Sequence, residues 1–174
     1  TLPGAVKYDL WIDNFSTGQK QLVRQDVTGT SYTPPVDLPM GLYRAWVRGI
    51  DAAGIHAAWS VVQEALVVPS VIPIGPLSGT FDRTPTFSWN PVTGAASYEL
   101  YVKNQNTGAM VINGTPTVAT NFTPASNLTD GPYRWWTLAV SPANIGPIKS
   151  GGSNPIDIFV GGRPTIIAPV TGSS

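Results

Sequence analysis

Residues able to carry out chemistry are scarce in this sequence. His56 is the only histidine and there is no cysteine, so a nucleophile has no convincing base and a zinc site has neither thiolates nor a second imidazole. The eight Asp and two Glu residues occur singly, without the Asp-X-Asp-X-Asp spacing of a calcium loop. No glycine-rich phosphate loop stands between a strand and a helix. The sequence therefore predicts a protein that is not an enzyme and holds no cofactor and no metal.

Isolated polar residues offer weaker alternatives. His56 lies in the segment Gly54–Ala57 and is predicted to be a solvated loop side chain rather than a catalyst. Asp13, Asp37 or Asp51 could contact a cation near a domain junction, although we expect each of them to be solvated at the surface.

Aromatic residues give the more informative signal. Successive side chains of a strand point to opposite faces, so an inward Tyr8 and Leu10 turn Trp11 outward. An inward Tyr43 likewise turns Trp46 outward. Exposed rings of this kind are typical of surfaces that contact a sugar, a neighbouring domain or a partner protein.

An internal repeat of 90 residues determines the architecture. Between Gly4 and Trp46, 15 of 43 positions are identical to the residue 90 positions later, with no gap. A unit of this length is a small independent domain rather than a solenoid repeat. Residues 169–173 also resemble residues 76–80. The sequence thus predicts a first repeat over 1–68, a second over 69–162, and a linker with the start of a third over 163–174.

Short strands separated by turns are predicted in both repeats. Residues 86–89, 98–103 and 133–140 alternate apolar and polar side chains, as strands with one buried face do. Clusters of turn residues occur at 14–18 and 104–108, and no segment has helical periodicity. This pattern predicts an all-β fold, a sandwich or a barrel.

The second repeat resembles a fibronectin type III domain of the bacterial kind. Pro-Thr-Phe-Ser-Trp-Asn-Pro-Val (85–92), Gly-Ala-Ala-Ser-Tyr-Glu-Leu-Tyr-Val (94–102) and Leu-X-X-Gly-X-Tyr (128–133) carry the resemblance, and the later strands of 1–68 share it. The resemblance implies that Trp89 is buried on strand B. It also implies that Tyr43 and Tyr133 are corner tyrosines, whose hydroxyls bond back to the main chain. We therefore expect tandem fibronectin type III-like (immunoglobulin-like) β-sandwiches, the first lacking its A and B strands.

Strands C and F are neighbours in that fold, which would place Trp11 and Trp46 on one outer face. The predicted face consists of Trp11, Arg44, Trp46 and Arg48, and of Tyr101, Arg134 and Trp136 in the second repeat. Two interpretations stay open. Cross-strand aromatic pairs with stacked arginines would serve the structure alone, whereas a free aromatic face would bind a ligand or a partner.

The composition favours an extracellular spacer. Ten basic and ten acidic residues give zero net charge without a run of either sign, which argues against nucleic acid, and no apolar stretch is long enough for membrane insertion. Cysteine-free β domains are more usual in bacterial surface proteins. We expect a non-catalytic structural or cell-adhesion module of a large secreted or cell-surface protein. The alternative is a carbohydrate-binding accessory module of a secreted enzyme that uses the outer aromatics.

The expected partners are other domains of the same chain, and in addition a cell-surface protein or a glycan. The segment 164–172 is itself similar to a strand A, and we predict that it pairs with a neighbouring molecule by strand exchange. Two prolines in Val68–Pro73 restrict the backbone, so the linker between the repeats is predicted to be stiff.

Overall fold

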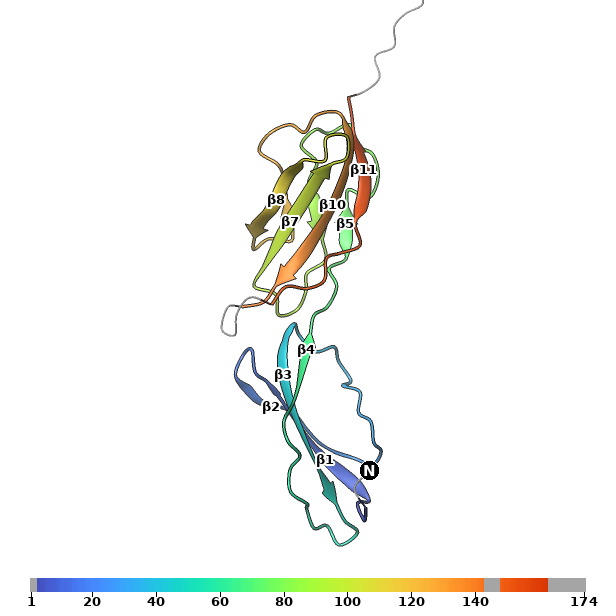
Figure 1. Cartoon of the computed structure of the whole chain (residues 1–174), viewed down its shortest axis with the longest axis vertical. Coiled ribbons are helices and arrows are strands. Elements are labelled where there is room, and N and C mark those ends of the chain that lie inside the picture. Colours follow the sequence, from blue (N-terminus) through green and yellow to red (C-terminus); the bar gives the residue numbers. More distant parts are fainter. Residues whose placement is uncertain (1–2, 143–147, 163–174) are drawn as a thin grey trace, which may run out of the picture.

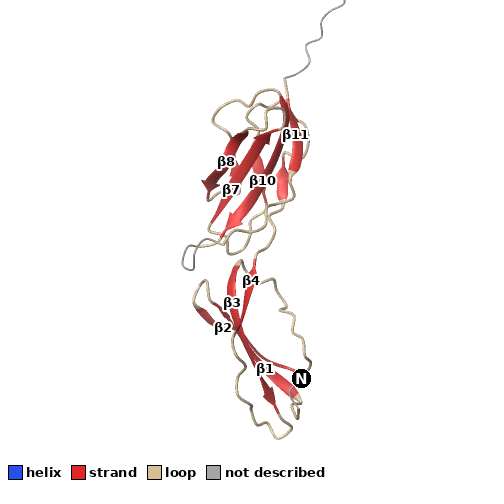
Figure 2. Ribbon diagram, viewed as in Figure 1, coloured by secondary structure: helices blue, strands red, loops and turns tan. Residues whose placement is uncertain are grey.

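The computed structural model describes residues 3–142 and 148–162, and every regular element within them is a β-strand (Figure 2). The strands form three antiparallel sheets in two units that stand end to end (Figure 1). The first unit holds one of these sheets and the second unit holds the other two. The prediction of an all-β fold is confirmed. The expected start of a third repeat lies outside the described residues.

The first unit is one four-stranded sheet. Its strands are β1 (Lys7–Asn14), β2 (Gln19–Val27), β3 (Gly41–Ile50) and β4 (Gln63–Val67), in the order β2-β1-β3-β4. A tight turn joins β1 to β2, where the side chain of Asn14 accepts the Thr17 N–H at 3.1 Å. Gly18 follows with a φ of 74°, a backbone conformation that favours glycine.

The second unit is a two-layered sandwich. One sheet has the order β11-β10-β7-β8 and the other the order β5-β6-β9. The strands of the larger sheet are β7 (Ser97–Asn104), β8 (Met110–Thr117), β10 (Gly131–Val140) and β11 (Ile156–Val160). Those of the smaller sheet are β5 (Pro73–Gly75), β6 (Phe87–Trp89) and β9 (Asn121–Phe122).

Aromatic side chains fill the space between these two sheets. Phe87 and Trp89 of β6 point inward and meet rings from the opposite sheet. The ring centroids of Phe87 and Trp135 are 5.3 Å apart, and those of Trp89 and Tyr98 are 5.5 Å apart. Trp89 is 1% exposed, which confirms its predicted place in the core on strand B.

Both corner tyrosines occur where the sequence predicts them. The hydroxyl of Tyr43 donates to the carbonyl of Pro39 at 2.8 Å, and that of Tyr133 donates to the carbonyl of Thr129 at 3.0 Å. Both residues are almost completely buried. Each hydroxyl therefore keeps a hydrogen-bond partner inside the protein, as a buried phenol requires.

The first unit has no second layer over the inner face of its sheet among the described residues. Tyr8, Leu10 and Val47 occupy this face, and their counterparts 90 positions later lie in the core of the second unit. The difference is largest at Val47, which is 40% exposed, whereas Thr137 at the same place in the second unit is 0% exposed. No strands equivalent to β5 and β6 cover this apolar sheet face among residues 3–142 and 148–162.

The two units meet through a loop of the first and a turn of the second. The Met40 N–H donates to the carbonyl of Thr93 at 2.8 Å, and the Met40 side chain, 1% exposed, joins the core cluster of the second unit. Gly94 has a φ of 88°, and a Cβ there would come within 2.8 Å of the Met40 backbone. Val71, in the predicted linker, is also buried in that core. The junction is therefore packed.

Candidate interaction surfaces

Three tryptophans gather on the outer face of the first unit. Trp11 and Trp46 are register partners on β1 and β3, with ring centroids 5.7 Å apart. Trp59, in the segment before β4, places its ring edge-on to Trp11 at 5.8 Å. The structure thus brings the two predicted tryptophans together. Trp59 was not among the predicted residues, because its position depends on how a segment without a strand folds over the sheet.

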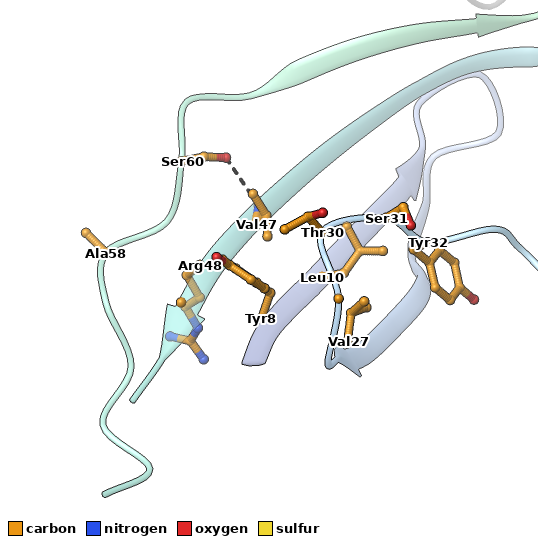
Figure 3. Close-up of a pocket in the computed structure, with 12 residues that line it drawn as sticks. Tyr8, Leu10, Val27, Thr30, Ser31, Tyr32, Val47, Arg48, Ala58 and Ser60 are labelled. Carbon is orange, nitrogen blue, oxygen red and sulfur yellow. Dashed lines mark hydrogen bonds between the residues drawn. The ribbon is translucent and has the colours of Figure 1, made fainter. Parts of the chain in front are cut away.

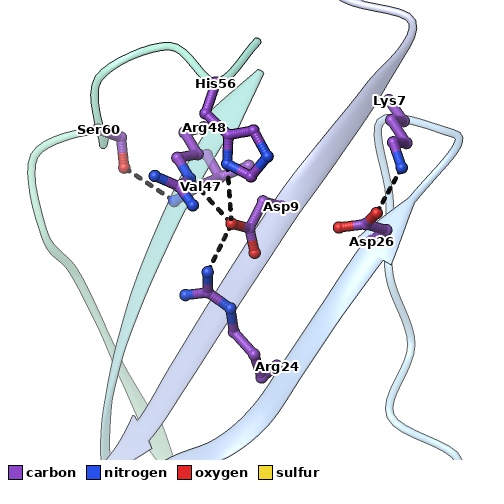
Figure 4. A network of polar contacts seen from close by, with 8 residues as sticks. All are labelled: Lys7, Asp9, Arg24, Asp26, Val47, Arg48, His56 and Ser60. Atoms are coloured by element: carbon purple, nitrogen blue, oxygen red, sulfur yellow. Dashed lines mark hydrogen bonds and ion pairs between the residues drawn. The ribbon is translucent and has the colours of Figure 1, made fainter. Parts of the chain in front are cut away.

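A buried carboxylate organises the charges on this face (Figure 4). Asp9, 2% exposed, accepts hydrogen bonds from Arg24 at 2.7 Å and from Arg48 at 2.8 Å. Both guanidinium groups also lie over the ring of Trp59, at 4.9 and 4.4 Å from its centroid. His56, expected to be solvated, is half-exposed with its Nδ1 3.8 Å from the same carboxylate.

Arg24 and Asp9 were absent from the predicted face, although strand alternation alone places Asp9 on the same side as Trp11. Arg24 required the β1–β2 register, in which it is the partner of Trp11. The arginines of this face therefore already have partners within the protein. A ligand would have to compete with the Asp9 ion pairs to reach them.

Arg44 takes no part in the tryptophan cluster. Its guanidinium group lies 3.6 Å above the centroid of the Phe15 ring, and its Nε donates to Glu64 at 2.8 Å. The predicted face is therefore divided. Trp11, Trp46 and Arg48 belong to one cluster, and Arg44 belongs to an exposed cross-strand pair between β3 and β4.

Asp13 is not solvated at the surface, contrary to expectation. It is 2% exposed and accepts hydrogen bonds from the Trp11 indole, from Lys20 at 3.0 Å and from the Gln21 N–H at 2.8 Å. Burial raises the pKa of Asp13, but these three donors outweigh burial and hold the pKa below its usual value. Gln21 has a φ of 51°, a strained conformation that points its N–H at this carboxylate.

The other acidic candidates do not form a metal site. Asp51 accepts the backbone N–H groups of Ala53 and Ile55 at 2.9 and 2.8 Å, which closes a turn after β3. Asp37 lies in the exposed loop before Met40. Within residues 3–142 and 148–162, no three His, Cys, Asp or Glu side chains are grouped in a way that could hold a metal ion.

The outer face of the second unit uses different chemistry at the same positions. The rings of Tyr101 and Trp136 stack in parallel, 5.4 Å apart with an interplanar angle of 1°. Glu99 accepts hydrogen bonds from the Tyr101 hydroxyl at 2.8 Å and from Lys149 at 2.9 Å. The Lys149 hydrogen bond lowers the pKa of Glu99, and burial opposes this effect. Arg134 is not over these rings but forms a two-bond ion pair with Asp157.

The open inner face of the first unit forms a cleft of about 600 Å³ (Figure 3). Side chains of β1, β2 and β3 make its floor, and residues 29–32 pass along one side of it. We call this space the inner-face cleft. Its lining is largely apolar and comprises the following residues: Tyr8, Leu10, Val27, Gly29, Thr30, Ser31, Tyr32, Val47, Arg48, Gly49, Ala58 and Ser60.

Solved structures share this arrangement of strands. A two-domain fibronectin type III segment of chicken tenascin matches with a TM-score of 0.57 and 16% identity, over 92% of this chain and 87% of that chain. The fold is that of tandem fibronectin type III domains. The FN1–FN3 domains of chicken CNTN1 match with a TM-score of 0.42 and 17% identity, over 89% of this chain. This chain spans 56% of that one.

No family model and no curated protein matches the sequence. In the part of the chain that the structure describes, no helix could cross a membrane. Two kinds of surface on this fold are accessible. They are the aromatic outer faces of the two units and the inner-face cleft of the first unit. The charged and aromatic side chains of the outer faces largely have partners already, through ion pairs and ring contacts with one another. The inner-face cleft, in contrast, is largely apolar and open to solvent.

Proposed function

We propose that this chain is a non-catalytic structural spacer of a large extracellular protein of bacterial type, in which it holds flanking domains apart or links surfaces in adhesion. The fibronectin type III-like fold supports this role, because domains of this kind are commonly structural modules. The absence of cysteine and the balanced charges agree with a secreted bacterial β protein. The partners are then neighbouring domains and a cell-surface protein or glycan.

The packed junction between the units is the observation that carries this proposal. A spacer transmits position and force only if its units do not bend freely about their linker. Here Met40 connects the two units. Its N–H donates to the carbonyl of Thr93, and its completely buried side chain packs in the core of the second unit. Asn90 in addition donates its N–H to the carbonyl of Ile72 at 2.9 Å, which fixes the linker to the second unit.

Spin-label distances test the stiffness. The chain lacks cysteine, so Thr28→Cys and Val118→Cys introduce one exposed label site in each unit. We expect a narrow distribution of distances between the two labels. The distribution should broaden when Met40→Ser removes the apolar side chain that packs in the second unit. Met110→Ser is the matched control, because Met110 pairs with Lys103 far from the junction. An equally broad distribution in the parent and in Met40→Ser would contradict a stiff spacer.

Carbohydrate binding is the second candidate, and the parallel Tyr101–Trp136 stack favours it, since flat aromatic pairs offer a surface to sugar rings. Titration of soluble glycans against tryptophan fluorescence tests this function. Trp136→Ala and Trp46→Ala should abolish a response that arises on either outer face. Unchanged spectra across a broad glycan panel would leave the rings with a structural role alone.

A further inference from the structure

The four-stranded sheet of each unit ends in an edge strand, β2 in the first unit and β8 in the second. Within residues 3–142 and 148–162, no further strand pairs with either of them. An edge at this place belongs to the fold itself, because the two-layered second unit has it as well. Exposed edges invite pairing with another chain, and natural proteins commonly blunt them. The 90-residue repeat allows the two edges to be compared position by position.

The alternation of hydrogen bonds decides which peptide groups of β2 face the free edge. On β3, the carbonyl of Val47 accepts the N–H of Ser60 at 2.8 Å, on the side towards β4. Successive residues of an antiparallel strand direct their peptide groups to opposite neighbours, so Arg48 pairs with its register partner Asp9 on β1. The peptide groups of Asp9 are thus used towards β3. Its partner on β2, Asp26, therefore directs its own N–H and C=O to the free edge.

The two edges differ at the positions that face outward. Arg24 faces the edge of β2 for the same reason as Asp26. On β8, Pro116 stands in the place of Asp26 and has no N–H to donate. Gly114 stands in the place of Arg24, has a φ of 67° and is skipped in the β7–β8 register, as the extra residue of a bulge is. The edge of β8 is therefore blunted, whereas residues 23–27 of β2 pair with β1 without a shift.

The sequence of β2 is self-complementary around Gln25. Two β2 strands that run antiparallel with this residue at the centre place Arg24 of one copy opposite Asp26 of the other, twice by symmetry. The same register places Val23 opposite Val27. Oppositely charged residues and β-branched residues are favourable cross-strand pairs. Because the peptide groups of Arg24 and Asp26 also face the edge, each of these pairs can exchange two main-chain hydrogen bonds.

The side chains of Arg24 and Asp26 are accessible on the outer face of the sheet (Figure 4). Arg24 is partly exposed and donates from Nη2 to Asp9 at 2.7 Å. Asp26 is half-exposed and accepts from Lys7 at 2.6 Å. A guanidinium group carries five N–H donors and a carboxylate has about four acceptor sites. Each side chain can therefore add a partner from a second copy while it keeps the one that it has.

We propose that two copies of this chain pair through their β2 strands, antiparallel and centred on Gln25, so that two four-stranded sheets become one sheet of eight strands. The contact is isologous, because the same strand serves in both copies, and it closes at a dimer. Five residues from each strand form a small interface, which is typical of weak and reversible contacts. This inference goes beyond the spacer function and does not rest on it.

Amide exchange with water, measured for each residue by NMR, tests the contact in the parent chain without any substitution. On going from micromolar to millimolar concentration, the amides of Arg24 and Asp26 should exchange more slowly. The amides of Val23, Gln25 and Val27 face β1 and should change little. Unchanged exchange at Arg24 and Asp26 up to millimolar concentration would overturn the proposal.

Sedimentation velocity over the same concentrations should show a monomer–dimer equilibrium for the parent. Asp26→Pro copies Pro116 of the second unit, removes the edge N–H and should leave the chain monomeric. Asp26→Asn keeps this N–H and should weaken the dimer by about 2- to 30-fold, since it removes two charged cross-strand pairs. Leu66→Pro is the matched control. By the same alternation its N–H faces the free edge of β4, on the opposite side of the sheet, and it should dimerise like the parent.

The variants also separate this contact from other modes of association. Dimers that persist unchanged in Asp26→Pro would overturn the proposal. Dimers that are lost in Leu66→Pro but not in Asp26→Pro would assign the contact to β4 and overturn it as well. If Asp26→Pro does not fold, the exchange rates of Arg24 and Asp26 in the parent still decide.

Discussion

Two tryptophans of the second unit provide a matched pair for measuring how much one part-buried hydrogen bond contributes to stability. Trp89 and Trp135 are both completely buried, and each packs against another aromatic ring. They differ at the indole nitrogen. The Nε1–H of Trp135 donates to the carbonyl of Pro76 at 2.9 Å, whereas the Nε1–H of Trp89 has no acceptor within the described residues. Substitution by Phe removes a similar volume at both positions.

Trp89→Phe and Trp135→Phe therefore lose a similar amount of packing, but only Trp135→Phe loses a hydrogen bond. Trp135→Phe leaves the carbonyl of Pro76 without its donor, while Trp89→Phe removes an N–H that was already unpaired. Pro76 is only partly buried, so water can replace the lost donor and the typical net value of one hydrogen bond applies, about 0.5–1.5 kcal/mol. We expect Trp135→Phe to lower the free energy of unfolding by about 0.5–1.5 kcal/mol more than Trp89→Phe does.

Native-state hydrogen exchange measures this difference. The slowest amides of β7 and β10 report the unfolding of the second unit, so the first unit does not enter the comparison. The double variant shows whether the two effects add, because the two rings belong to one core and could couple. Equal losses in the two single variants, or a larger loss in Trp89→Phe, would refute the reasoning.

Three further predictions concern the junction and the buried carboxylates. Gly94→Ala should broaden the Thr28–Val118 spin-label distance distribution as Met40→Ser does, because its Cβ would collide with the Met40 backbone; an unchanged distribution would contradict this. Asp13→Asn should destabilise the first unit at neutral pH. Because the folded pKa of Asp13 is lowered, the difference from the parent should shrink as pH falls below the ordinary value of 3.8; a pH-independent difference in urea midpoint would contradict it. Asp9→Ala should weaken the tryptophan bands in near-ultraviolet circular dichroism, since Arg24 and Arg48 lose their shared anchor over Trp59; an unchanged spectrum would show that the rings pack without it.

Much of the fold follows from local sequence patterns. The 90-residue repeat identifies equivalent strands, so that Tyr43 predicts the role of Tyr133. Alternation then decides which side chains point inward, and it places Trp11 and Trp46 on one side of the sheet. These inferences succeed because each depends on the residues of one strand or on a gapless comparison of two copies.

The rest depends on contacts between segments distant in sequence. Asp13 looks like a surface acid in the sequence, because the three donors that enclose it come from residues whose positions a hairpin and a strained backbone determine. Trp59 joins the tryptophan cluster from a segment that belongs to no strand. Met40 is one of only two methionines, and nothing in its own neighbourhood indicates that it would enter the core of the other unit.

Residual dipolar couplings from both units in one weakly aligned sample test most directly whether the chain is a stiff spacer. If the contacts of Met40 hold the two units rigidly together, the couplings of both units fit a single alignment tensor, with the relative orientation of Figure 1. Two independent tensors, with the smaller magnitude in the first unit, would show that the units reorient freely and would contradict the account.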